Sequence, residues 1–179
     1  MFSSQKTIVS IDLKGMIASG SRAPLNMDNL NGLFSKLMKM KFNALSIVIN
    51  SPGGSPVQSS LIAQKIREIS AKKKVKCYCF VEDVAASGGY WLACAADEIY
   101  ADINSIVGSI GVISGGFGFT DLIKKIGVER RIFTAGENKS FLDPFQKINK
   151  KDEDKLIKLQ KLIHQNFICL LYTSDAADE

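Results

Sequence analysis

Short apolar runs alternate with longer helical patterns along the first part of the chain. The runs are rich in β-branched and apolar residues, as strands are, and lie at residues 7–13, 44–50, 76–81 and 98–101. The run at 44–50 is almost continuously apolar, which is typical of a strand buried on both faces of a sheet. Helices are predicted at 26–40, where apolar side chains recur at helical spacing, and at about 57–70. This order of strands and helices predicts an α/β fold with a parallel sheet.

Glycines punctuate the second part of the chain. Helices are predicted at 90–96 and 119–126, and a strand at 128–133. A longer helix at 151–168 has acidic residues in its first turn and an apolar face that should meet a missing partner or another subunit. Residues 105–113 are apolar and uncharged, which suits either the wall of a groove for apolar side chains or a buried strand with bulges. The candidate groove residues are Gly108, Ser109, Ile110, Gly111 and Val112.

Composition narrows the class of protein. With 179 residues, 46% hydrophobic and 23% charged, the chain fits one globular domain with a sizeable core. No apolar run approaches the roughly 18 to 20 residues that span a bilayer, and the start lacks a signal-peptide pattern, so a soluble chain is expected. Four cysteines without C-x-x-C spacing support neither a zinc site nor a disulfide framework. The net charge of +5 is spread over solvated helical faces rather than gathered for nucleic acid.

Ser87 is the first candidate for chemistry. It lies in the segment Val84-Ala85-Ala86-Ser87-Gly88-Gly89, between an apolar strand and a small-residue helix. A serine at a sharp strand-to-helix turn exposes its hydroxyl beside unpaired helix-start amides, which is how a nucleophile is presented. The alternative is a tight turn in which the serine hydroxyl only caps the helix.

A second glycine-bearing turn follows the preceding strand, at Ser51-Pro52-Gly53-Gly54. Backbone N–H groups near a helix start can bind a developing oxyanion. The alternative is an ordinary turn capped by Ser55. Because the carboxyl ends of parallel strands meet at one edge of a sheet, this turn and the Ser87 turn can share a cleft.

A serine nucleophile needs a base. The single histidine, His164, lies in the terminal amphipathic helix without an acidic partner at hydrogen-bonding spacing, so a Ser-His-Asp triad is poorly supported. A lysine can do the same work when burial or nearby positive charge lowers its pKa. Lys139, in a turn-rich loop before Phe141 and Leu142, is the candidate.

Four motifs in order resemble the signal peptide peptidase A family of serine peptidases. They are Ile49-Asn50-Ser51-Pro52-Gly53-Gly54, Asp83-Val84-Ala85-Ala86-Ser87-Gly88-Gly89-Tyr90, Gly108-Ser109-Ile110-Gly111 and Gly136-Glu137-Asn138-Lys139-Ser140. The resemblance implies that Ser87 is the nucleophile and Lys139 the general base, with Gly53, Gly54 and Gly88 around the oxyanion hole. It also implies a crotonase- and Clp-peptidase-like fold of repeated ββα units, and rings whose active sites form at protomer interfaces.

These observations predict a peptidase domain at residues 7–168. Residues 169–179 resemble the translation of a sequencing adapter, and we hypothesise that native sequence ends near Ile168. The expected activity is cleavage of apolar peptides, such as remnant signal peptides, through an acyl-enzyme, without a metal or cofactor. A crotonase-type acyl-thioester enzyme and a non-catalytic ring scaffold are the alternatives. Many members of the family carry a membrane anchor that this chain lacks, so a cytoplasmic or peripherally membrane-associated location is expected.

Overall fold

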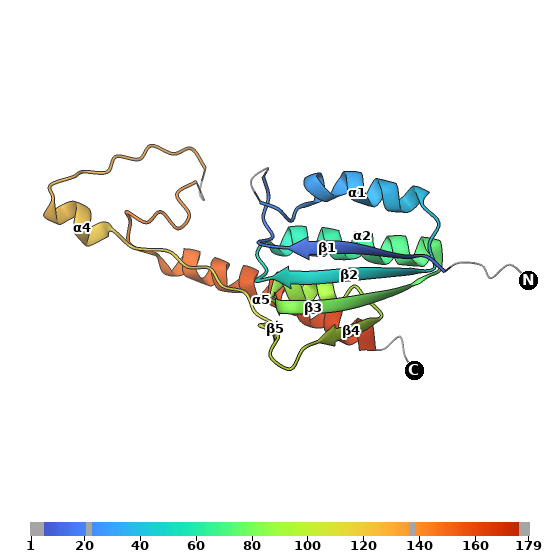
Figure 1. Cartoon of the computed structure of the whole chain (residues 1–179). Helices are drawn as coiled ribbons and strands as arrows, with labels where there is room; N and C mark the ends of the chain where they lie inside the picture. Colours follow the sequence, from blue (N-terminus) through green and yellow to red (C-terminus); the bar gives the residue numbers. More distant parts are fainter. Residues whose placement is uncertain (1–5, 21–22, 137–138, 176–179) are drawn as a thin grey trace, which may run out of the picture. The chain divides into compact units, whose positions relative to one another are not determined.

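The computed structural model describes residues 6–20, 23–136 and 139–175 (Figure 1). Contacts divide the chain into two compact units: Met1–Gly111 with Asn166–Glu179, and Val112–Gln165. The strands are β1 (Ile8–Lys14), β2 (Ala44–Ser51), β3 (Lys76–Ala86), β4 (Glu98–Ala101) and β5 (Ile106–Gly108). The helices are α1 (Met27–Lys39), α2 (Pro56–Lys73), α3 (Gly88–Ala93), α4 (Thr120–Lys125) and α5 (Lys150–Asp175).

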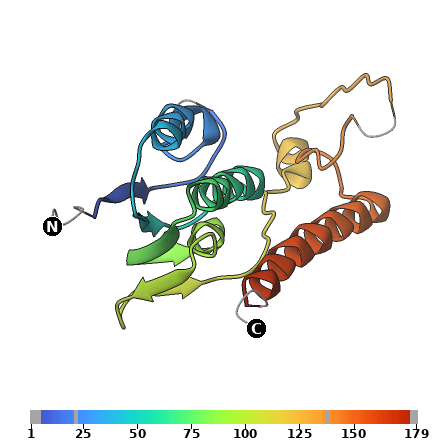
Figure 2. The ribbon, with the colours of Figure 1, turned by 90° about the vertical axis from the view of Figure 1, so that its right-hand side faces the viewer.

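The first unit is built on a parallel sheet. Its strands follow one another in the order β1-β2-β3-β4, and β5 pairs with the end of β3. Strand-helix-strand units nearly always cross over with right-handed sense, so strands laid down in chain order keep their helices on one face. Figure 2 shows α1 and α2 on the same side of the sheet. The predicted α/β fold with a parallel sheet is confirmed, and the carboxyl ends of β2 and β3 lie at the same edge.

The face of the sheet under the helices forms the core. Alternate strand side chains are buried there: Ile11, Leu13, Leu45, Ile47, Ile49, Cys77, Cys79 and Val81. Helices α1 and α2 contribute Leu30, Phe34, Leu37, Ile62, Ile66 and Ile69. Ser55 caps α2, because its hydroxyl accepts a hydrogen bond from Gln58 N–H. The burial of every second strand residue shows which side chains of the sheet face the helices.

The opposite face of the sheet is not covered by α1 or α2 and is partly exposed (Figure 2). Lys14 pairs with Glu82 at 2.5 Å, and Phe80 stacks on Tyr100 with ring centroids 5.3 Å apart. Ser46 is buried but Val48 is only half-buried, so the expected burial of the run at 44–50 on both faces is incomplete in the described structure. The reason is topological, since crossovers that all advance in one direction leave no helix for this face.

Two element boundaries differ from the predictions in ways that matter for the site. β3 continues five residues past the predicted end at Val81, to Ala86, and α3 begins directly after Ser87. The predicted strand at 128–133 is wrong: these residues form no strand in the described structure. A strand needs a neighbour for its backbone hydrogen bonds, and the described residues of the unit that contains 128–133 include no strand.

The second unit is held by contacts between its own loops. Arg130 pairs with Asp143 at 3.0 Å and lies 4.9 Å from the centroid of the Phe145 ring. Phe119 donates its backbone N–H to Pro144 O at 2.7 Å, and its ring lies 5.5 Å from that of Phe145. The Phe145 backbone N–H and the Arg130 guanidinium both hold the pKa of Asp143 below its ordinary value. These contacts tie the loop around residue 143 to the start of α4.

Candidate active site

β3 contains a bulge shortly before Ser87. Ile49 pairs with Val81, but Ser51 pairs with Ala85, so β3 has extra residues between the two paired positions. Asn50 Nδ2 donates to Asp83 Oδ2 at 2.7 Å across this bulge. Bulges bend a strand and re-aim the side chains that follow, and they are common beside active sites. Here the bulge brings residues 84–86 into register with β5 and ends the strand at Ser87.

Ser87 has a strained backbone. Its φ is 51° and its ψ is −119°, a conformation that costs a non-glycine residue about 1–3 kcal/mol. The turn is held by its backbone: Ser87 N–H donates to Gly108 O at 2.7 Å, and Trp91 N–H donates to Ser87 O at 3.0 Å. The Ser87 side chain makes no capping hydrogen bond to α3. The alternative of a capping serine is therefore not supported, and the half-buried hydroxyl is left for other partners.

The loop after β2 packs against the Ser87 turn. Gly53 and Gly54 have φ of 94° and 141°, which side-chain-bearing residues rarely adopt. A Cβ added to Gly53 would stand 2.6 Å from Gly88 N and 2.9 Å from Ser87 Cβ, so only glycine allows the two turns to approach this closely. Ser51 fixes the loop, because its buried hydroxyl donates to Gly15 O at 2.7 Å and accepts from Gly53 N–H at 3.2 Å.

Two backbone amides therefore lie together beside Ser87. Gly88 opens α3, and first-turn N–H groups have no acceptor inside their own helix. A Cβ on Gly88 would stand 3.3 Å from Gly54 N, so the backbone amide of Gly54 lies next to Gly88. Within the described residues, Gly54 N–H donates no backbone hydrogen bond, whereas Ser55 N–H donates to Ile17 O at 2.7 Å. Paired N–H groups of this kind suit a developing negative charge on oxygen.

The candidate groove residues begin at β5, next to this turn. Gly108 accepts the Ser87 N–H, and both Gly108 and Ser109 have positive φ, at 100° and 53°. Ile110 is 39% exposed. β3 is the one described strand that pairs with β5, so the other edge of β5 carries backbone groups with no strand beside them. Gly111 ends the first unit and Val112 begins the second.

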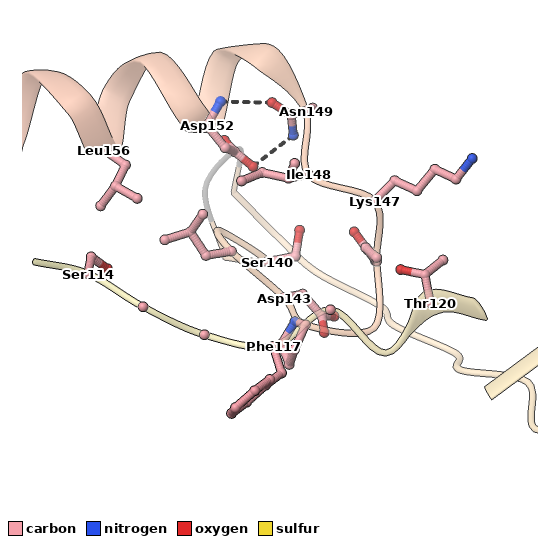
Figure 3. A pocket seen from close by; sticks show the side chains of 16 residues that line it. Ser114, Phe117, Thr120, Ser140, Asp143, Lys147, Ile148, Asn149, Asp152 and Leu156 are labelled. Atoms are coloured by element: carbon pink, nitrogen blue, oxygen red, sulfur yellow. Dashed lines mark hydrogen bonds between the residues drawn. The ribbon is translucent and has the colours of Figure 1, made fainter. Parts of the chain in front are cut away.

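Lys139 belongs to the second unit, whereas Ser87 belongs to the first, so the structure describes the two separately. Lys139 is exposed. The neighbouring motif residues Glu137 and Asn138 lie outside the described residues. Ser140 and Leu142, which follow Lys139, line a cavity of about 450 Å³ within this unit (Figure 3). Thr120, Asp143 and Asp152 line it as well, so its wall is mixed in polarity.

Among the described residues, the histidine, the buried cysteines and the possible metal ligands add no further candidate for catalysis. His164 is half-buried on α5, in the second unit. Burial raises the pKa of Cys77 and Cys79 to about 12, so neither thiol is a nucleophile near neutral pH. In the part of the chain that the structure describes, no group of three or more histidine, cysteine, aspartate or glutamate side chains could hold a metal ion.

Sequence reasoning missed the residues that hold the two turns together. Ser51 is fully buried and pins the Gly53 loop, and Ile17 forms an isolated bridge with Gly54. Ser59, also fully buried, donates to Ser55 O at 2.9 Å and occupies the space that a side chain on Gly88 would need. Ser51 lies inside the motif at residues 49–54, so the sequence could have indicated its role. Ile17 and Ser59 come from segments with no motif, so only the tertiary contacts identify them.

A strained serine between a strand and a helix, beside two glycine amides at the edge of a parallel sheet, is the arrangement of hydrolases that use serine as nucleophile. Residues 69–171 match the model of Peptidase family S49, and the chain belongs to that family. This match includes Ser87 and Lys139, whereas the Gly53-Gly54 loop lies before it. The family resemblance seen in the four motifs is thus confirmed.

Curated relatives are much longer than this chain. It is 52% identical over 162 residues to the Na(+)/H(+) antiporter NhaA of Brucella melitensis biotype 1, a match covering 88% of the chain and 22% of that protein. It is 31% identical over 146 residues to the chloroplastic serine protease SPPA of Arabidopsis thaliana, covering 82% of the chain and 21% of that protein. The chain therefore spans about a fifth of the length of these two relatives.

A solved structure has a similar fold. It is a lysine-to-alanine variant of the 1510-N membrane-bound stomatin-specific protease in complex with a substrate peptide, with a TM-score of 0.50 and 20% sequence identity. The match covers 63% of the present chain and 49% of that one. In the described part of the present chain, every helix is too short or too polar to cross a membrane.

Proposed function

We propose that this protein is a serine peptidase that uses Ser87 as nucleophile and Lys139 as general base. The observation that carries the proposal is the conformation of Ser87, a strained residue whose hydroxyl makes no capping hydrogen bond. Strain of this kind persists only where the surrounding structure imposes it, and it is concentrated at functional sites. Membership of Peptidase family S49 supports the same reaction class.

The proposed reaction passes through an acyl-enzyme. Ser87 Oγ attacks the scissile carbonyl carbon while neutral Lys139 Nζ takes the hydroxyl proton. When the tetrahedral intermediate collapses, the C–N bond breaks and the lysine returns that proton to the leaving amine. Water then attacks the ester, giving up a proton to the lysine, and Ser87 Oγ leaves with a proton as the carboxylic acid product is released.

The Gly54 and Gly88 amides supply the oxyanion hole in this proposal. Their N–H groups lie beside Ser87, where the carbonyl oxygen of a bound peptide becomes negatively charged. Losing one such donor in a well-studied serine peptidase costs about 2.7–4 kcal/mol of transition-state stabilisation. Gly53 allows this arrangement because it has no side chain, since a Cβ at residue 53 would displace Gly88 N.

The substrate is an extended peptide with apolar side chains, such as a cleaved signal peptide. Support comes from residues 108–112, an uncharged segment that starts at β5 and borders Ser87. An extended peptide can add to a strand edge through its main chain and place alternate side chains in apolar depressions. The related Arabidopsis protein is named a serine protease, which supports peptide rather than thioester chemistry.

Assembly into a ring and proximity to a membrane are further parts of the proposal. Ser87 and Lys139 belong to different compact units, which suits a site completed between protomers. The second unit exposes large apolar side chains that an interface would cover: Ile113, Phe117, Ile126 and Phe133. Similarity to a protein named as a membrane-bound protease motivates the membrane hypothesis.

Covalent labelling with a fluorophosphonate probe tests the proposal. Wild-type protein should gain the mass of one phosphonyl group on the Ser87 peptide, and Ser87→Ala should not be labelled while keeping its circular dichroism spectrum. Ser35→Ala, at an exposed position on α1, is the matched control and should label like wild type. Unlabelled wild type that hydrolyses an acyl thioester would instead indicate a crotonase-type enzyme. Unlabelled protein without either activity would indicate a scaffold.

A further inference from the structure

Helix α3 carries both groups of the candidate site. Ser87 is its N-cap residue and Gly88 its first residue, yet the helix has only six residues. Helices shorter than about 12 residues are marginal on their own, so packing decides where such a helix lies. The contacts of α3 therefore set the positions of the Ser87 hydroxyl and the Gly88 amide.

The start of α3 lies against small groups. A Cβ on Gly88 or Gly89 would collide with Ser59 Oγ or Ser51 O, so these contacts fix how closely the helix approaches the sheet. At its C-terminal end, Arg67 Nη2 donates to Cys94 O at 2.5 Å. These two close approaches and one hydrogen bond act near the backbone of the helix, so its rotation and tilt also depend on its larger side chains.

Leu92 and Trp91 are the large buried side chains of α3, and Trp91 makes the ring contact. Its ring stacks on Phe167, with centroids 4.8 Å apart and planes 26° from parallel. Trp91 is 8% exposed and Phe167 is 2% exposed, so the stack is a core contact. Trp91 also donates its backbone N–H to Ser87 O, one helical turn back. One residue, Trp91, therefore contacts both the Phe167 ring and Ser87.

We infer that Phe167 is a positioning residue for this site, an inference that rests on the proposed function. In this inference Phe167 acts through Trp91 and not on the reacting groups directly. By holding Trp91 it fixes the rotation of α3, and with it the aim of the Ser87 hydroxyl and of the Gly88 N–H. A displacement of about 1 Å at a reacting group can lower a rate about 100-fold, whereas ground-state binding along the groove tolerates it.

The test compares the same substitution at two buried phenylalanines. Phe167→Leu removes the ring but keeps an apolar side chain, so the protein should stay folded. Phe34→Leu, at a fully buried position on α1, is the matched control. For Phe167→Leu we expect kcat to fall about 10- to 100-fold with KM within about 3-fold. For Phe34→Leu we expect kcat within about 2-fold of wild type, even if its stability falls equally.

Trp91 provides a readout that needs no activity, since the chain has one tryptophan. Its emission should shift to longer wavelength in Phe167→Leu and stay unchanged in Phe34→Leu. A shifted emission with wild-type kcat would overturn the inference while leaving the proposed function standing. An unshifted emission would overturn the stack itself. Wild-type protein that neither cleaves peptide nor labels at Ser87 would overturn the proposed function. The inference would then fall as well, even if Phe167→Leu shifts the emission of Trp91.

Discussion

Gly53→Ala tests the close approach on which the site geometry depends. The substitution should destabilise the fold for two reasons. At φ of 94° an alanine is strained by about 1–2 kcal/mol. Its Cβ would also stand 2.6 Å from Ala86 O and Gly88 N, and overpacking of this kind costs about 1–3 kcal/mol. The neighbours are backbone atoms, which cannot rotate away as a flexible side chain can. We therefore expect the free energy of unfolding to fall by about 2–5 kcal/mol.

Gly20→Ala separates the two contributions. Gly20 has a φ of 102°, close to that of Gly53, but a Cβ there would meet nothing within 4 Å. This control should lose only the strain of about 1–2 kcal/mol. Both substitutions lower the conformational entropy of the unfolded chain by the same amount, so this contribution to stability cancels when the two variants are compared.

Urea denaturation followed by Trp91 fluorescence measures both variants, with unchanged m-values as the sign that only stability moved. Folded Gly53→Ala should also react more slowly with a fluorophosphonate probe than folded Gly20→Ala, because the Ser87 turn must shift to admit the Cβ. Equal losses of stability in the two variants, within about 0.5 kcal/mol, would refute the contact between the Gly53 loop and the Ser87 turn.

Three other predictions follow from the same structure. Ser87→Gly should be about 1–2 kcal/mol more stable to urea than Ser87→Ala, because glycine relieves the strain at φ of 51° and alanine keeps it; equal stabilities would argue against the strained turn. Lys139→Arg should be nearly as inactive as Lys139→Ala in peptide turnover, because a guanidinium stays protonated and cannot accept the Ser87 proton. Substantial activity in the arginine variant would exclude Lys139 as the base. Finally, burial raises the pKa of the Cys77 and Cys79 thiols from 9.0 to about 12, so the unfolded chain releases these protons first. The free energy of unfolding should then fall as pH rises from about 9 toward about 12, and Cys79→Ala should flatten that fall in denaturation curves.

Local sequence predicted most of the elements and pointed to the candidate site. Periodicity located the strands and helices of the first unit to within a few residues, because each buries one set of side chains against the same core. The helix caps at Asn26 and Ser55 likewise follow from short-range chemistry. Ser87 stood out because small residues and glycines surround it, a pattern that is typical of a tight turn.

Tertiary structure decided the remaining features of the fold and the site, because these features depend on contacts between distant segments. The strand expected at 128–133 had a suitable pattern but no neighbour to pair with. The run at 44–50 is almost continuously apolar, yet one-directional crossovers place α1 and α2 on one face (Figure 2), and Val48 on the other face is only half-buried. The positive φ of Ser87 arises from the β3 bulge and the Gly108 hydrogen bond, and the stack on Phe167 joins residues far apart in the chain. A pattern within one segment carries no information on such pairings, so these features had to come from the folded chain.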